Sequence, residues 1–179
     1  MPKRLQLLHE LIPNVARFGV LADPVNVVTR PVITDLQAGA RTLGVQLIVV
    51  NARTDSDLET AFATFSQQRV GAVLVSASAF YNGRRQQLAA LAARHALPAI
   101  FPYREHALAG GLMSYGINLD YIWHQIGMLT ARILGGEKPA NLPVEQSVKF
   151  ELTLNLKTAK ALGLTIPETL LATADEVIQ

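Results

Sequence analysis

The chain has 179 residues, a formal net charge of +2 and no cysteine; half of it is apolar and 17% is charged. This length and apolar content predict about one folded domain with a full core, and they exclude a disordered chain. The lack of cysteine excludes disulfides, zinc–thiolate and iron–sulfur sites, and a cysteine nucleophile. Basic residues are scattered apart from the Arg84–Arg85 pair, so we expect no binding to nucleic acid.

Apolar residues alternate between helical and strand spacing in the first half of the chain. Pro13 ends the first helix, Gly44 closes the second in a left-handed cap, and Thr54 opens the capping region of the third. The spacing predicts helices within residues 5–12, 33–43 and 58–65, and strands at residues 17–22, 45–50 and 72–75.

The second half continues this alternation and then changes in character. We predict a helix over 84–94, strands at 97–101 and 112–115, a long helix over 118–134, an extended linker at 138–143, a half-exposed strand at 147–155 and a short helix at 156–162. Strands that alternate with helices of this length imply parallel pairing with right-handed crossovers. We therefore predict an α/β fold with a doubly wound, mostly parallel sheet.

Ligands of an open parallel sheet bind outside the carboxyl ends of its strands. The residues at these predicted ends are 22–26, 51–53, 76–81, 102–105 and 114–116. They supply small hydroxyls, a few aromatic rings and occasional charges, a lining that suits a small ligand with polar and aromatic parts.

The segment from Phe80 to Arg85 leads from a strand end into a predicted helix N-terminus. Phe80 or Tyr81 could stack on an aromatic ligand, and Arg84 could pair with a carboxylate. The alternative is a surface aromatic residue that packs against the start of the helix.

Catalytic signals are weak, so the sequence favours binding over chemistry. Of the four histidines only His106 lies close to a strand end, and no G-x-S-x-G turn surrounds Ser76 or Ser78. Asp23 could accept a phosphoryl group, as in receiver domains, but the acidic pair that such a site needs is absent. There is no dinucleotide fingerprint, P-loop or metal-spaced cluster, so we expect no cofactor and no metal.

Two blocks of the sequence resemble a bacterial family of ABC-transporter substrate-binding proteins. Residues 150–164 (FELTLNLKTAKALGL) resemble its C-terminal signature, residues 103–116 (YREHALAGGLMSYG) resemble a second block, and residues 3–24 match the middle of the family's sequences. The family is similar to type I periplasmic binding proteins, in which two lobes close on a ligand about a hinge. Some members bind aromatic amino acids.

The resemblance implies a division of the chain and a set of ligand-binding residues. Residues 1–111 would form a ligand-binding lobe, and residues 112–179 would be crossover and C-terminal elements that return to a first lobe missing here. The positions that match the family's cleft are Asp23, Asn26, Ser76, Ser78, Phe80, Tyr81, Arg104 and Tyr115, and the segment from Phe80 to Arg85 adds Arg84 to the predicted ligand-binding residues.

The resemblance also implies a function, partners and a location. We expect part of the solute-binding component of an ABC import system, with a small ligand such as an amino acid and a transporter permease as partners. The alternative is an effector-sensing domain of a cytoplasmic regulator with the same fold. The family is periplasmic or at the cell surface, but this sequence shows no export signal, which predicts the cytoplasm for a complete gene product. Apolar surface left by the missing lobe predicts a homodimer in which the helix over 118–134 packs on a second chain.

Overall fold

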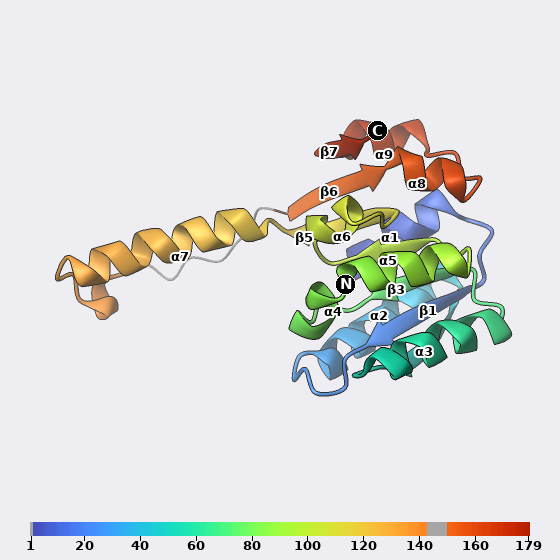
Figure 1. Ribbon diagram of the computed structural model, residues 1–179, viewed down its shortest axis with the longest axis horizontal. Helices are drawn as coiled ribbons and strands as arrows, with labels where there is room; N and C mark the ends of the chain where they lie inside the picture. Colours follow the sequence, from blue (N-terminus) through green and yellow to red (C-terminus); the bar gives the residue numbers. More distant parts are fainter. Residues whose placement is uncertain (1, 143–149) are drawn as a thin grey trace.

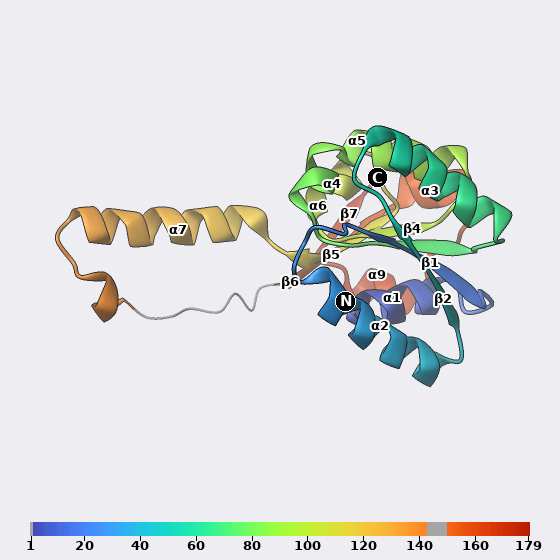
Figure 2. The same cartoon turned by 90° about the horizontal axis from the view of Figure 1, so that it is seen from below.

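The computed structural model describes residues 2–142 and 150–179, and these form one sheet with helices on both faces (Figures 1 and 2). The strand order is β2-β1-β3-β4-β5-β6-β7. The strands are β1 (Arg17–Ala22), β2 (Gln46–Asn51), β3 (Ala72–Val75), β4 (Ala99–Phe101), β5 (Met113–Ile117), β6 (Phe150–Asn155) and β7 (Glu176–Ile178). Strands β1 to β5 are parallel, β6 runs antiparallel to β5, and β7 runs parallel to β6. The predicted doubly wound, mostly parallel sheet is confirmed.

Helices connect the strands and cover the sheet. They are α1 (Pro2–Leu11), α2 (Thr29–Leu43), α3 (Asp55–Gln67), α4 (Ala79–Gly83), α5 (Arg85–Arg94), α6 (Arg104–Leu108), α7 (Leu119–Leu134), α8 (Leu156–Ala161) and α9 (Glu168–Thr173), with a 3₁₀ turn η1 (Pro139–Asn141). Helices α1, α2 and α9 lie on one face, and α3 to α6 lie on the other (Figure 2).

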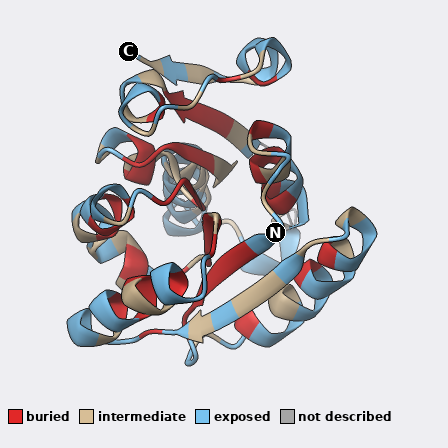
Figure 3. Ribbon diagram, turned by 90° about the vertical axis from the view of Figure 1, so that its right-hand side faces the viewer, coloured by how far each residue is buried: buried red, intermediate tan, exposed pale blue. Residues whose placement is uncertain are grey.

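The central strands are buried on both faces, as their continuous apolar sequences predict. Val20 and Leu74 pack into one cluster with Leu5 and Leu8 of α1, whereas Val73 packs into a second cluster under α3 and α5. Figure 3 shows these inner strands as buried between helices that turn exposed faces to solvent. The sheet is therefore a rigid base for the loops at its edges.

Two local predictions about helix ends are confirmed. Gly44 ends α2 with φ = 69°, in the left-handed region. Thr54 begins α3 with a reciprocal capping box, in which its side chain accepts from the backbone of Asp57 and the Asp57 carboxylate accepts from the backbone of Thr54.

Several short elements differ from the prediction. Residues 79–83 already form helix α4, where the sequence predicted a loop leading to a helix at 84. Helices α6 and α9 and strand β7 were not predicted, because three to six residues are too few to show a period. Within the predicted extended linker, Pro139–Asn141 forms a 3₁₀ turn. Residue 143 of that linker and residues 147–149 of the predicted sixth strand lie outside the described residues.

Strand β6 is more buried than its alternating sequence predicts. Leu152, Thr153 and Leu154 are all buried, because β7 pairs with the outer side of β6 and shields it.

Helix α7 projects away from the rest of the molecule (Figures 1 and 2). None of its 16 residues is buried, and its exposed apolar side chains are Tyr121, Trp123, Ile126, Met128, Ile133 and Leu134. Among the described residues, no helix combines the length and apolar character needed to cross a membrane.

Candidate ligand-binding site

The parallel strands β1 to β5 end at one edge of the sheet, and the polar residues that follow them meet there. Asp23 follows β1, Arg53 follows β2 by two residues, and Ser76 follows β3. Because the strands are in parallel register, with Leu21 beside both Val50 and Val75, the loops after these strands lie side by side.

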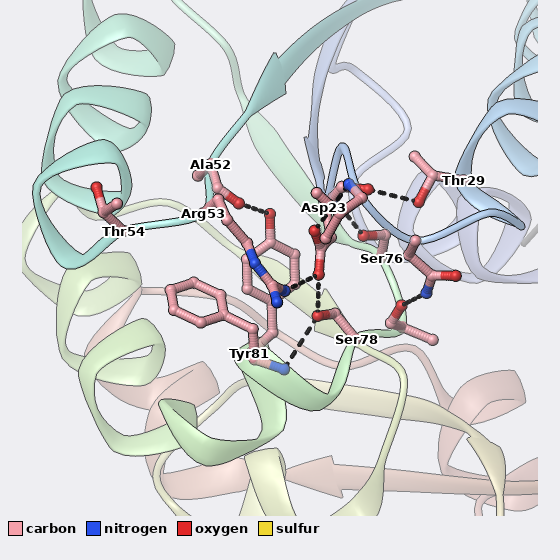
Figure 4. Close-up of polar contacts among 12 residues, drawn as sticks. Asp23, Thr29, Ala52, Arg53, Thr54, Ser76, Ser78 and Tyr81 are labelled. Carbon is pink, nitrogen blue, oxygen red and sulfur yellow. Dashed lines mark hydrogen bonds and ion pairs between the residues drawn. The ribbon is translucent and has the colours of Figure 1, made fainter.

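The carboxylate of Asp23 is the centre of a buried hydrogen-bond network (Figure 4). The side chain is 2% exposed. One carboxylate oxygen accepts from Ser78 Oγ at 2.5 Å and from Arg53 Nη1 at 2.7 Å, and the other accepts from the backbone of Val25 at 3.2 Å. The backbone N–H of Asp23 also donates to Ser76 Oγ at 3.3 Å. The buried negative charge is thus balanced by one guanidinium and further donors, as a buried charge requires.

Asn26 ties the loop after β1 to the loop after β3. Its Nδ2 donates to the backbone oxygen of Ala77 at 2.9 Å, and its Oδ1 accepts from the backbone of Val28 at 3.2 Å. The structure therefore brings together Asp23, Asn26, Ser76 and Ser78, four of the residues that the sequence predicted to line a cleft.

Ser78 and Phe80 shape the start of helix α4. Ser78 caps the helix by accepting from the backbone of Phe80 at 3.1 Å. Two guanidinium groups lie over the half-buried Phe80 ring, that of Arg84 at 4.0 Å and that of Arg53 at 5.2 Å from the ring centroid. Arg84 also forms an ion pair with Asp55, so both its charge and its planar face already have partners.

The structure corrects the expectation that Tyr81 stacks on a ligand. Its ring is completely buried in the core, and its hydroxyl donates to the backbone oxygen of Ala52 at 2.9 Å. Burial, with the nearby Asp23 charge as a smaller cause, raises the pKa of the phenol. Tyr81 therefore supports the site from beneath.

A hollow of about 210 Å³ lies beside this network, at the ends of β3, β4 and β5. It is lined by Arg4, Ala77, Pro102, Tyr103, Tyr115, Gly116, Ile117 and Phe150. Ala77 joins it to the Asp23 network, because Asn26 bonds to the backbone of that residue. The Tyr115 and Phe150 rings stack at 5.7 Å with 17° between their planes, which gives the hollow one aromatic wall.

Gly116 brings the end of β5 against the end of β4. A Cβ atom at this position would lie 1.7 Å from the backbone oxygen of Pro102, so any larger residue would push the two strand ends apart. The shape of the hollow therefore depends on a glycine at this position.

Arg104 lies elsewhere. It forms a two-pronged ion pair with Glu176 of β7, with 2.7 Å between Nη2 and Oε1, and hydrogen bonding to Glu176 raises its pKa. It lines a separate hollow with Asn118, Asp120, Glu151, Thr153, Asp175 and Glu176. The structure therefore does not bring Arg104 into contact with the Asp23 network.

His106, the histidine closest to a strand end, is completely buried. Its ring stacks on Phe101, with 5.0 Å between centroids, and burial lowers its pKa to about 4. It is therefore a neutral core residue at pH 7. In the part of the chain that the structure describes, no three His, Asp or Glu side chains are grouped so that they could hold a metal ion.

Three residues at this edge were not among the predicted site residues: Arg4, Arg53 and Tyr103. The sequence held a signal for Arg4, which shares a helix face with Leu8 and Leu11 at i, i+4 and i+7. A base on the buried face of a helix is unusual. Arg53 and Tyr103 lay within the predicted strand ends but were not singled out.

Comparisons with known proteins agree on the kind of protein. The sequence model of a family described as ABC transporter substrate binding protein matches residues 1–178. No curated protein sequence matches significantly.

Two solved structures share this fold with a TM-score of 0.87 each. One is a conserved domain protein from Vibrio cholerae, which is 23% identical over 98% of this chain. The other is an ABC domain in complex with L-Trp from Streptococcus pneumonia, which is 22% identical over 99% of this chain. The ligand-free, open structure of a substrate-binding protein with adhesive properties from Clostridium difficile is also similar, with a TM-score of 0.71 and 20% identity over 99% of this chain. The matched regions are 59%, 61% and 59% of those chains, so this chain spans about three fifths of their length.

Proposed function

The chain belongs to the ABC transporter substrate-binding protein family, and we propose that it forms one lobe of a two-lobed protein that binds a small solute for import. The observation that carries this proposal is the joined pair of features at the carboxyl ends of the parallel strands. A fixed polar network around Asp23 adjoins a partly aromatic hollow through Ala77. A concave, mainly apolar surface with a few convergent polar groups is typical of small-molecule sites.

We propose that residues 1–111 form the body of the ligand-binding lobe and that residues 112–179 cross to a first lobe and return, with Tyr115 and Phe150 of the crossing strands completing the hollow. The projecting helix α7 supports this division, because it leaves the body after β5 and the chain re-enters the sheet at β6 (Figure 1). Closure of two lobes about such a crossing would sequester the solute.

The solute class we propose is an amino acid with an apolar or aromatic side chain. The structure from Streptococcus pneumonia is a complex with L-Trp, and Phe80, Tyr115 and Phe150 supply aromatic surface at the same edge as the Asp23 network. Asp23, Asn26, Ser76 and Ser78 would position the polar end of the solute or the loops that contact it. The solute would be bound without covalent change and passed to a transporter permease outside the cytoplasm.

We also propose that helix α7 packs on a second copy when this chain is alone. Leu119, Ile122, Ile126, Leu129 and Ile133 are spaced alternately by three and four residues, the spacing that makes a seam between two helices. Because no residue of α7 is buried in one chain, this seam lacks a partner within the described residues.

Thermal-shift screening of the amino acids tests the proposed function. We expect one or more apolar amino acids to raise the melting temperature, and Phe80→Ala to reduce this shift. Arg84→Ala should reduce it as well, because the Arg84 guanidinium packs on the Phe80 ring and helps to hold it in place. Arg94→Ala is the matched control for Arg84→Ala, because Arg94 pairs with Glu59 on the surface, away from the edge. A screen without any stabilising solute, both on this chain and on a version carrying the first lobe, would contradict the proposal.

A further inference from the structure

We propose that Arg4 binds the anionic group of the solute, so that the solute is a small carboxylate with an apolar body. This inference rests on the proposed function, and it identifies the residue and the ligand group that give the site its charge specificity.

The Arg4 side chain is buried but has spare donors. The residue is 8% exposed and lies in the first turn of α1. Its Nη1 donates to the backbone oxygen of Val75, the last residue of β3, at 2.8 Å. A guanidinium has five N–H donors, and this is the one hydrogen bond that the Arg4 side chain makes within the described ranges 2–142 and 150–179. The same side chain lines the hollow beside Tyr103 and Tyr115.

Three other arginines near the carboxyl ends of the strands are already neutralised. Arg53 pairs with Asp23 at 2.7 Å, and the guanidinium groups of Arg84 and Arg104 pair with Asp55 and Glu176. Across the part of the chain that the structure describes, no carboxylate lies within ion-pair distance of Arg4. Of these four arginines, Arg4 is therefore the one that has no carboxylate partner among the described residues, and it can take the anionic group of a solute.

A buried cation without a counter-ion is costly to keep. Burial lowers the pKa of Arg4 to about 10, while the nearby Tyr103 phenol opposes that shift, so the guanidinium stays charged at pH 7. Leaving such a charge unpaired destabilises a protein, and replacing buried charges by apolar side chains is often neutral or stabilising. A buried, unpaired guanidinium that lowers stability at the edge where ligands bind is typical of a residue retained for function.

The surroundings of Arg4 fit a carboxylate attached to a compact apolar group. The planar guanidinium can hold both oxygens of a carboxylate at once. Next to it, the stacked Tyr115 and Phe150 rings offer a flat apolar wall, and the volume of about 210 Å³ suits a solute with one ring or a branched chain.

The test compares an acid with its neutral amide on the intact chain. The probes are 3-phenylpropionate and 3-phenylpropanamide, which differ in charge but hardly in shape, and binding is measured by calorimetry and thermal shift. We expect the acid to bind at least about tenfold more tightly than the amide, as loss of charged hydrogen bonds predicts. Arg4→Met should reduce acid binding to the level of the amide and leave amide binding unchanged. Arg4→Lys should retain part of the preference.

Arg17→Met is the matched control, because Arg17 also donates to one backbone oxygen, that of Gln68, but on the exposed surface; it should bind the acid as the wild type does. The comparison of acid and amide on the wild-type chain requires no substitution. If the two bind equally well there, this inference is overturned and the proposed function stands. The same holds if Arg4→Met keeps the preference, or if neutral solutes bind while the acid does not. Failure of both probes and of every amino acid in the screen would overturn both proposals.

Discussion

Ser78 donates its hydroxyl hydrogen to the carboxylate of Asp23 at 2.5 Å, although 55 positions separate the two residues in the sequence. This bond joins the loop after β1 to the cap of helix α4. Because Arg53 donates to the same oxygen, Asp23 holds together loops from three adjacent strands. The shape of this half of the proposed cleft therefore depends on one buried carboxylate.

Asp23→Ala is expected to lower the free energy of unfolding by about 2 kcal/mol, since Ser78, Arg53 and Val25 lose a charged acceptor. Solute binding should fall with it, because the loops after β1 and β3 lose their link. Asp35→Ala is the control, as Asp35 is exposed on α2. Urea unfolding checks both variants, and an Asp23→Ala protein as stable as Asp35→Ala would show that the network contributes little.

Gly116→Ala and Gly127→Ala should shift stability in opposite directions. At Gly116 a Cβ would lie 1.7 Å from the backbone oxygen of Pro102, whereas at Gly127, on exposed α7, it would meet nothing within 4 Å. Gly116→Ala should therefore lower the melting temperature and disturb the hollow. Gly127→Ala should stabilise α7 by up to about 1 kcal/mol, because alanine is the better helix former. Melting curves and circular dichroism measure both effects, and equal melting temperatures for the two variants would count against the close approach at Gly116.

Stability should fall as the pH drops from 6.5 towards 4, because of His106. Burial lowers its pKa from 6.5 to about 4 in the folded chain, so between these values the unfolded chain binds a proton that the folded chain excludes. The resulting loss in the free energy of unfolding reaches up to about 3 kcal/mol at low pH and vanishes above pH 6.5.

Urea titrations at pH 5 and pH 7.5 measure this difference. His106→Phe should reduce it, whereas replacing the exposed His124 of α7 by asparagine should not. A pH dependence that His106→Phe leaves intact would assign the effect to other groups.

Self-association through α7 should depend on the apolar seam. Ile126→Glu places a charge at its centre and should give a monomer in sedimentation velocity at micromolar concentration. His124→Glu changes the opposite face of the same helix and should leave association intact. A wild-type chain that is monomeric under the same conditions would contradict the proposed dimer.

The long elements could be predicted from the sequence, because each carries its own period and its own end signals. The helix that Gly44 closes and the helix that Thr54 caps both depend on neighbours within a few residues. The sequence also placed Asp23 and Ser78 at the same edge, since parallel strands must end together. The fate of Tyr81 could not be predicted this way: its burial depends on Ala52, a residue from another strand end that accepts its hydroxyl hydrogen.

Arg4 was missed for a related reason. Helix α1 runs back across the sheet, so its first turn lies at the carboxyl ends of strands that come much later in the chain, and Arg4 reaches Val75 across 71 positions. Long-range partners such as Val75 for Arg4 and Glu176 for Arg104 are set by tertiary packing. The helical spacing could show that Arg4 is buried, but it could not show what Arg4 contacts.

Mapping a bound solute by ¹H–¹⁵N NMR titration tests the central proposal most directly. With the strongest amino acid from the thermal screen, we expect amide shifts concentrated at the carboxyl ends of the strands, at residues 23, 25, 26, 76–80, 103, 104 and 115–117, together with Arg4. Shifts concentrated at the opposite edge of the sheet, around residues 15–17 and 69–71, would contradict a cleft at the carboxyl ends of the strands.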